Sequence, residues 1–268
     1  MNKRILLTVA YDGTAYSGWQ IQPQGETVEG TLNRALTELL EQETAVIGAS
    51  RTDAGVHALG NRAVFDTKSM IPAEKFSYAL NRYLPQDIRI NASKEVPDDF
   101  HPRKTNCEKT YVYQIYNAPF PDPTRRLYSH FTYVPLDVQK MKKAAQHFVG
   151  TQDFAAVSTF KPEVESTVRT IMQITVEAEE ETAGPAEKKH AGMITITVRG
   201  NGFLYHMVRI IAGTLIDVGC GRLQPEQIPV ILESKDREKA GQTAPACGLT
   251  LREIRFIPEP EVGAEDAD

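Results

Sequence analysis

The side chains best placed for covalent chemistry lie in one short stretch, Gly48–Ala58, which reads GASRTDAGVHA. Its glycines let the backbone turn tightly and let a ligand approach closely. Asp53 lies two residues after Arg51, and a nearby cation favours the ionised carboxylate that a nucleophile or a general base needs at neutral pH. The residues alone leave a second interpretation open, in which Asp53 caps the turn and pairs with Arg51 for stability.

Other reactive chemistries lack their motifs in this sequence. No G-x-x-x-x-G-K-[ST] phosphate loop is present, and Gly48–Thr52 resembles a nucleophile elbow but ends in threonine instead of glycine. The three cysteines are widely spaced without a C-x-x-C pair, and the six histidines show no zincin spacing. The sequence therefore predicts neither a metal site nor a disulfide framework.

The elements that would position this stretch follow from hydrophobic periodicity. Arg4–Tyr11 has the pattern of a strand, and residues 25–27 open a helix whose apolar side chains recur at helical spacing. A short strand, Ala45–Ala49, runs into the loop Ser50–His57. Alternation at Ala63–Asp66 indicates the next strand, so the loop is expected to connect two strands.

The rest of the chain mixes strands and helices without strict alternation. We expect strands at Tyr111–Tyr116, Leu127–Val134, Val168–Ala178, Met193–Arg199 and Leu249–Ile257, and helices from Pro72, from Asp137 to Gly150, at Phe203–Val218 and at Pro225–Glu233. The polar segment Glu179–Ala191 is expected to form an exposed hairpin loop. Sequential strands mixed with helices favour an α+β fold, with antiparallel mixed sheets flanked by helices.

The chain is expected to divide into two halves and a tail. We place an N-terminal α+β half that carries the catalytic loop at 1–104 and a C-terminal α+β half at 105–257. Residues 258–268 are expected to form an acidic, disordered tail. A chain of 268 residues is long enough to bury about three quarters of its unfolded surface without disulfides or metals.

Composition and charge exclude some classes of protein. With 24% charged and 41% hydrophobic residues the composition is soluble and globular, and no apolar run approaches the ~20 residues of a membrane helix. The N-terminal apolar stretch is too short for a signal peptide, and the few cysteines fit reduced thiols in the cytoplasm. The net charge is −5, but the tail holds five acidic and no basic residues, so the remainder is neutral and compatible with a local basic face.

Arg51–His57 resembles the signature of the tRNA pseudouridine synthase A family, in which Gly-Arg-Thr-Asp-Ala-Gly-Val-His surrounds the catalytic aspartate. Ser50 stands here in place of the first glycine. Further segments are similar to the family's landmarks and lie in the same order: Tyr11–Thr14 with Gly18–Gln20, Phe100–Arg103, Lys109–Tyr113, Phe203–Arg209 and Ala244–Leu249. Several landmarks in order are far more specific than any one alone, and they span essentially the whole chain before the tail.

This resemblance implies the pseudouridine synthase fold, in which two similar α/β halves have the active-site cleft between them. It implies an isomerase that converts uridine to pseudouridine at positions 38, 39 and 40 of the tRNA anticodon stem and loop. The family uses no cofactor and no catalytic metal, and it acts as a homodimer with tRNA spanning both subunits. We therefore expect a cytoplasmic homodimer whose partner is the anticodon arm of tRNA.

By resemblance, Asp53 is the essential carboxylate, and Arg209 pairs with it and keeps it charged. Arg51 is expected to contact RNA phosphate or the flipped base, since its planar guanidinium can bond two oxygens. Without the family, Arg209 reads as a helix arginine that extends past apolar neighbours to solvent. The sequence leaves open whether Asp53 attacks the ribose or the uracil, or removes a ribose proton.

Substrate contacts follow from the same resemblance. Tyr111 would stack on the target uracil and recover part of the cost of flipping the base, and Leu249 would line the uracil pocket. Residues of both types are also common in the core of a strand. Arg103 and Lys109 are expected to contact the RNA, which would make binding sensitive to salt.

Two other classes of function are the alternatives. One is a tRNA-binding or folding protein without catalysis, but Asp53, Arg209 and Tyr111 together favour the enzyme, because binding alone needs no carboxylate facing phosphates. The other is a metal-dependent nuclease, which needs clustered carboxylates or histidines that the sequence does not show. The chain departs from the family's usual residues at Ser50, Pro102, Lys104 and Ile210.

Overall fold

The computed structural model describes residues 2–162, 164–179 and 190–261, which form two compact units. Unit 1 comprises Met1–Glu108 and Leu251–Asp268, and unit 2 comprises Lys109–Thr250. The last strand belongs mainly to unit 1, although the sequence analysis placed it with the second half.

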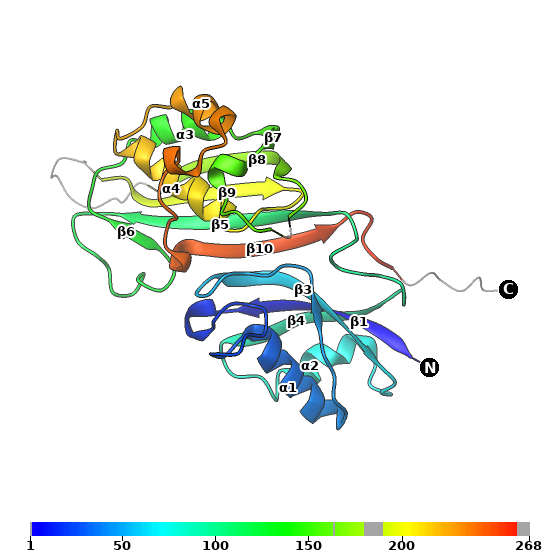
Figure 1. Ribbon diagram of the computed structural model, residues 1–268. Coiled ribbons are helices and arrows are strands. Elements are labelled where there is room, and N and C mark those ends of the chain that lie inside the picture. The colour runs from blue at the N-terminus through cyan, green and yellow to red at the C-terminus, as the bar shows by residue number, and fades with distance from the viewer. Residues whose placement is uncertain (1, 163, 180–189, 262–268) are drawn as a thin grey trace. The chain divides into compact units, whose positions relative to one another are not determined.

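The sheet of unit 1 has the strand order β4-β1-β3-β10 (Figure 1). Its strands are β1 (Lys3–Tyr11), β3 (His57–Thr67), β4 (Ile88–Val96) and β10 (Leu249–Phe256), and the short β2 (Ile47–Gly48) pairs with β3. β1 is antiparallel to both neighbours, so that Leu7 lies opposite Ala63 on one side and Ser93 on the other. The predicted strand Ala45–Ala49 is reduced to two residues, Ile47 and Gly48.

Two helices of unit 1 cover one face of this sheet (Figure 1). α1 (Val28–Leu40) begins where the sequence predicts, because the Thr27 hydroxyl oxygen accepts the N–H of Gly30 and caps the first turn. α2 (Phe76–Leu80) follows a 3-10 turn, and its Phe76 meets Phe65 of β3 edge-on with 5.2 Å between the ring centroids. This aromatic contact fastens α2 to the sheet.

The sheet of unit 2 has the strand order β5-β9-β8-β7. Its strands are β5 (Cys107–Asn117), β7 (Gly150–Asp153), β8 (Val168–Glu179) and β9 (Gly192–Gly200), and β6 (His130–Thr132) pairs with β5. The pairs β5–β9, β8–β9 and β7–β8 are antiparallel, whereas β6 runs parallel to β5. The strand predicted at Leu127–Val134 forms only at its centre.

The helices of unit 2 are α3 (Val138–Gln146), α4 (Met207–Gly219) and α5 (Gln227–Ser234). As predicted, Asp137 caps α3 by accepting the N–H of Lys140 at 3.0 Å. The predicted end of this helix at Gly150 is wrong, because Gly150 has φ +109° and opens β7. α3 packs on α4 and on β8, so the strongly apolar α4 lies in the core of the unit, as its composition predicts.

The predicted start of the apolar helix at Phe203 is also wrong. α4 begins at Met207, because His206 has φ +61° and so interrupts the helical conformation. The ring of Tyr205 stacks on that of His206 at 3.7 Å, and the Thr159 hydroxyl lies 3.1 Å from Nδ1 of His206. These contacts hold residues before the helix in a loop that apolar periodicity does not reveal.

The expected α+β class with mainly antiparallel strands is confirmed by these elements. The predicted hairpin loop at Glu179–Ala191 and the predicted tail at 258–268 fall largely outside the described residues, which omit 180–189 and 262–268. The three cysteines are free thiols. Across the described ranges, no helix is long and apolar enough to cross a membrane.

Candidate active site

The loop that carries Asp53, residues 49–56, lies between β2 and β3 in unit 1. The N–H of Ala49 still donates to the carbonyl of Arg62 on β3 at 2.7 Å, and the chain rejoins the sheet at His57. Gly55 lets it turn back, with φ +75°, a conformation that glycine adopts without steric cost. The loop is therefore a tight excursion from the sheet, as the sequence predicts.

A neighbouring segment holds this loop through backbone hydrogen bonds. The N–H of Trp19 donates to the carbonyl of Thr52 at 3.0 Å, and the N–H of Gly55 donates to the carbonyl of Tyr16 at 3.3 Å. Gly18 permits this close approach, because its φ is +96° and a Cβ there would lie 2.8 Å from the Thr52 carbonyl oxygen. The backbone is thus fixed on both sides of the aspartate.

Trp19 also packs against the strand that leads into the loop. Its side chain is 1% exposed, and its ring lies 5.9 Å from that of Tyr11, measured between centroids. Gly48, at the end of β2, passes so close to the indole that a Cβ would lie 2.4 Å from it. The strand that leads into the loop therefore requires glycine where it crosses the indole.

The end of the loop is joined to the turn that follows β1. His57 is 4% exposed, and its Nδ1 accepts the N–H of Gly13 at 3.1 Å. Asp12 Oδ1 lies 3.1 Å from the same ring nitrogen and accepts both the N–H and the hydroxyl of Thr14. Two sequence landmarks that are far apart in the chain are therefore parts of one support.

The side chains at the tip of the loop differ in exposure. Asp53 is half-buried, whereas Arg51 is exposed. Ser50 is buried, and it is absent from the described non-glycine residues with positive φ, which are Glu41, His206 and Lys235. Serine in place of the signature's glycine therefore introduces no backbone strain.

Tyr111 lies on β5 in unit 2 and is 7% exposed. Its ring meets Phe203 edge-on, with 5.2 Å between centroids and 85° between planes. Val198 of β9 lies opposite it in the ladder. This packing fixes the orientation of the phenol ring, a contact of Phe203 that its place in a landmark segment does not reveal.

Arg209 lies in the first turn of α4 and is half-buried. Its Nε donates to the carbonyl of Ala244 at 2.8 Å, and its own carbonyl accepts the N–H of Ala244 at 3.1 Å. One turn further, Gly213 approaches the same segment so closely that a Cβ would lie 1.8 Å from the carbonyl oxygen of Gln242. The guanidinium is therefore oriented by a backbone carbonyl next to the helix.

The segment that leads to Leu249 packs on Tyr113 of β5. The Tyr113 hydroxyl donates to the carbonyl of Pro245 at 2.9 Å, and burial raises the pKa of this phenol above its ordinary value. Gly248 lies against the same ring, where a Cβ would be 2.7 Å from Cζ. Leu249 follows at the start of β10 and is 5% exposed.

The two residues expected to contact RNA lie in different surroundings. Arg103 is exposed in a turn, and its N–H donates to Nδ1 of His101 at 3.2 Å. Burial, together with the cations of Lys104 and Arg103, lowers the pKa of His101. Lys109 is half-buried near the start of β5, opposite Gly200.

The candidate residues divide between the units. Unit 1 carries Asp53, Arg51 and Arg103, and unit 2 carries Tyr111, Arg209, Leu249 and Lys109. Within each unit, the residues that hold them in place come from distant parts of the chain. Sequence reasoning did not assign the supporting contacts of Tyr16, Trp19, Phe203, Tyr113 and Ala244, although all of these except Tyr16 lie in segments that resemble the family's landmarks.

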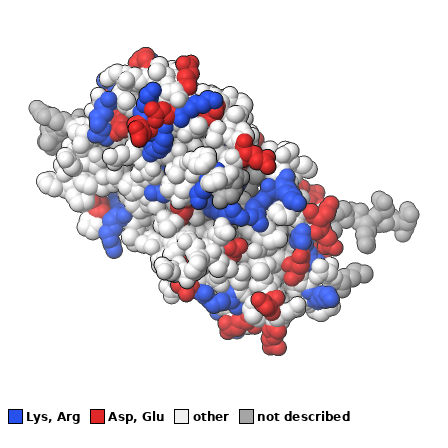
Figure 2. All heavy atoms as spheres, viewed as in Figure 1, with Lys and Arg blue, Asp and Glu red and all other residues white. Residues whose placement is uncertain are grey.

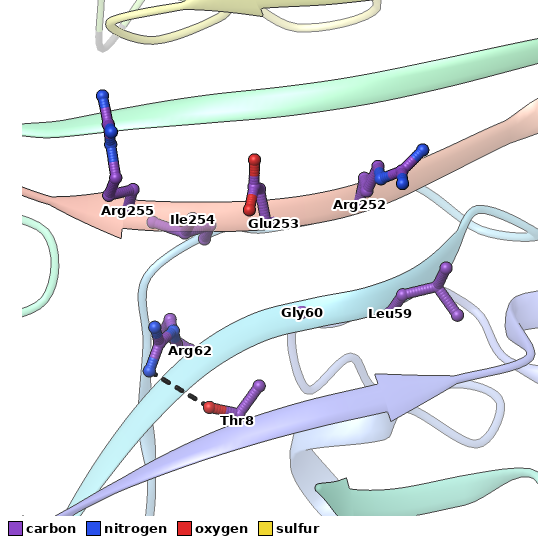
Figure 3. A pocket seen from close by; sticks show the side chains of 8 residues that line it. All are labelled: Thr8, Leu59, Gly60, Arg62, Arg252, Glu253, Ile254 and Arg255. Carbon is purple, nitrogen blue, oxygen red and sulfur yellow. Dashed lines mark hydrogen bonds between the residues drawn. The ribbon is translucent and has the colours of Figure 1, made fainter. Parts of the chain in front are cut away.

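Unit 1 also has an open groove of about 310 Å³ beside β3 and β10 (Figure 3). It is lined by Thr8, Leu59, Gly60, Arg62, Arg252, Glu253, Ile254 and Arg255. Arg62 donates to the Thr8 hydroxyl at 3.1 Å and pairs with Glu259 at 3.4 Å, and Arg255 pairs with Glu108 at 2.6 Å. In Figure 3 the charged ends of the arginines point in different directions, so the groove does not gather them around one reacting atom.

On the face shown in Figure 2, basic and acidic side chains occur in several places. In the part of the chain that the structure describes, no group of three or more His, Cys, Asp and Glu side chains is arranged to hold a metal ion.

Comparisons with known proteins give a consistent result. A profile of the family described as tRNA pseudouridine synthase matches residues 7–103 and 144–257. The tRNA pseudouridine synthase A of Ruminiclostridium cellulolyticum is 48% identical over 254 residues, covering 95% of this chain and 100% of that protein. The tRNA pseudouridine synthase A 2 of Clostridium tetani is 46% identical over 258 residues, covering 96% and 100%.

Among solved structures, a chain in the crystal structure of a Cbf5-Nop10-Gar1 complex aligns with 97% of this chain and 60% of its own length. Its sequence identity is 14% and its TM-score is 0.30, which is too low to carry an argument. The profile match includes Asp53, Arg209 and Leu249, whereas Tyr111 and Lys109 lie between the two matched ranges.

Proposed function

Because the chain belongs to the tRNA pseudouridine synthase family, we propose that it isomerises uridine to pseudouridine at positions 38, 39 and 40 of the tRNA anticodon stem and loop. The observation that carries this proposal is the loop that presents a half-buried Asp53 from a backbone fixed on both sides. A carboxylate that is held in place before the substrate arrives suits a reaction at one ribose–uracil unit.

The proposed reaction breaks the bond between ribose C1′ and uracil N1, turns the uracil, and forms a bond between C1′ and C5. The proton on C5 is lost and N1 gains one, so the product is an isomer of the substrate and no oxidant or reductant is required. Asp53 is the essential carboxylate in this proposal. It attacks the ribose or the uracil, or it removes a ribose proton, and each role requires its ionised form.

Arg209 and Arg51 assist in this proposal. A guanidinium close to Asp53 would hold the carboxylate in its ionised form, and the bond from Arg209 Nε to the Ala244 carbonyl orients that guanidinium. Arg51 is exposed on the same loop as Asp53, where it would contact RNA phosphate or the flipped base.

The uracil would be held by Tyr111 and Leu249. The edge-on contact with Phe203 orients the ring of Tyr111 before a base arrives, which lowers the entropic cost of stacking on it. Arg103 and Lys109 would contact the RNA backbone. We further propose a cytoplasmic homodimer that binds the folded anticodon arm by shape as much as by sequence, without a cofactor or metal.

The test is to incubate unmodified tRNA transcripts with the wild-type protein and with Asp53→Asn, and to map pseudouridine by carbodiimide labelling and primer extension. The expected result is a signal in the anticodon arm that requires Asp53. No signal from wild-type protein, with tight and salt-sensitive tRNA binding, would favour a tRNA-binding protein without catalysis.

A second measurement separates the isomerase from a metal-dependent nuclease. Product formation is expected to survive EDTA, provided that a parallel binding assay shows the tRNA still folded and bound. RNA cleavage that EDTA abolishes and Mg²⁺ restores would contradict the proposal.

A further inference from the structure

Three buried, hydrogen-bonded residues join the Asp53 loop to the sheet, and we call them the trio. They are Tyr11 of β1, Thr52 of the loop and Asn61 of β3. Their exposed fractions are 4%, 7% and 0%. The hydroxyl oxygens of Tyr11 and Thr52 lie 2.7 Å apart. Nδ2 of Asn61 donates to the Tyr11 oxygen at 3.3 Å and to the carbonyl of Ser50 at 3.0 Å. The trio therefore joins the loop to two strands of the sheet.

Asn61 is hydrogen-bonded at both ends of its side-chain amide. Both N–H groups of its amide are donated, and its Oδ1 accepts the N–H of Arg62 at 2.9 Å. The Tyr11 oxygen accepts from Asn61 and shares a hydrogen bond with the Thr52 hydroxyl, in which either oxygen can be the donor. A buried polar network with these partners rigidifies the groups that it joins.

Thr52 is consequently held at two atoms. Tyr11 bonds its hydroxyl, and the N–H of Trp19 bonds its carbonyl oxygen at 3.0 Å. The carbonyl carbon of Thr52 is bonded to the nitrogen of Asp53, so these two contacts fix the peptide plane from which the Asp53 side chain projects. Misplacing a reacting group by about 1 Å can cost about a hundredfold in rate.

We propose that Tyr11 is a positioning residue for Asp53, which acts through Thr52, and that Asn61 orients its phenol. This inference rests on the proposed function, because it concerns the step that Asp53 performs. Tyr11 does not touch the substrate. It restricts the orientations of the carboxylate, so its loss slows the chemical step and leaves tRNA affinity unchanged.

The test begins with Tyr11→Phe, which removes the hydroxyl and keeps the ring beside Trp19. The single-turnover rate of pseudouridine formation at saturating enzyme is expected to fall about tenfold, with the tRNA Kd within about twofold of wild type. Thr52→Val should lose as much, and Thr52→Ser, which keeps the hydroxyl, should retain the rate. The double variant Tyr11→Phe/Thr52→Val should be no slower than either single variant, because both remove the same bond.

The matched control is Ser93→Ala, which removes another buried hydroxyl of unit 1. The Ser93 oxygen accepts the N–H of Ser77 at 2.9 Å, away from the loop. The thermal stability of Ser93→Ala is expected to fall as in Tyr11→Phe. Its rate of pseudouridine formation should stay at the wild-type value.

Two results would overturn the inference, and they differ. If the wild-type protein forms pseudouridine and Tyr11→Phe forms it at the same rate, the trio supports folding alone. Absence of product from the wild-type protein would overturn the proposed function and this inference with it.

Discussion

The Asp53 loop and the groove beside β3 and β10 adjoin the same strand of unit 1. They differ in how their charged side chains are arranged. In the loop, backbone bonds to Trp19 and Tyr16 fix the chain from which the half-buried Asp53 projects. In the groove, arginines predominate, but Arg62 and Arg255 each pair with a carboxylate, and their charged ends diverge (Figure 3).

This contrast indicates that a cluster of charged side chains does not by itself identify a reaction site. The ion pairs of the groove are partly exposed, and exposed pairs contribute only about 0–1 kcal/mol because water competes for their partners. A group whose backbone is fixed before the substrate binds avoids the cost of being ordered during the reaction. We therefore expect substitutions in the loop and its supports to have larger effects on activity and binding than substitutions in the groove.

The largest effect is expected from Asp53→Asn. The amide cannot act as a nucleophile or a base, so pseudouridine formation should fall by about a thousandfold or more, with tRNA binding within about tenfold of wild type. The measurement is single-turnover product formation alongside a binding titration. A variant that melts well below the wild-type temperature would show instead that Asp53 is needed for folding.

The next effect is expected from Arg209→Ala. The Nε of Arg209 donates to the backbone carbonyl of Ala244, which orients its guanidinium. Its loss should slow the reaction about a hundredfold if its guanidinium stabilises an ionised carboxylate.

The control for Arg209→Ala is Arg222→Ala, because Arg222 is an exposed arginine that pairs with Asp217 near the end of the same helix. Its rate should match that of wild type. Equal rates in the two variants would remove Arg209 from the proposed site.

A smaller effect, on stability, is expected from Gly48→Ala. The new Cβ would lie 2.4 Å from the Trp19 indole, so either the strand or the ring must move, at a cost of about 1–3 kcal/mol in the free energy of unfolding. Urea denaturation measures this difference. Gly202→Ala is the control, since a Cβ there has its nearest contact at 3.8 Å. Equal denaturation midpoints in the two variants would show that Gly48 is not tightly packed against the Trp19 indole.

The sequence predicted the elements that local patterns specify. The apolar stripe after residues 25–27 located α1, and the small residues around Asp53 indicated a tight loop between strands. It placed the start of α4 too early, because the conformation of His206 depends on contacts with Thr159, which lies far from it in the chain.

The supports of the site were beyond the reach of these patterns for the same reason. Tyr11 and Thr52 are 41 residues apart, and Tyr11 and Asn61 are 50 residues apart. Periodicity reports which face of an element is buried, and it carries no information about which distant side chain meets it. The residues around Asp53 indicated it as a candidate, the resemblance to a family added Arg209, and only the structure supplied what holds them.

The smallest effect is expected from Arg252→Ala in the groove, and it tests the comparison most directly. Arg252 is exposed and points away from Arg62 and Arg255 (Figure 3), so the tRNA Kd should change by less than about twofold. Arg51→Ala in the loop should weaken binding about tenfold and flatten its dependence on salt, because a phosphate or base contact is lost. Titrations of both variants at two salt concentrations make the measurement. If Arg252→Ala weakened binding as much as Arg51→Ala, the groove would belong to the RNA-binding surface, and its divergent arginines would be sites for separate phosphates.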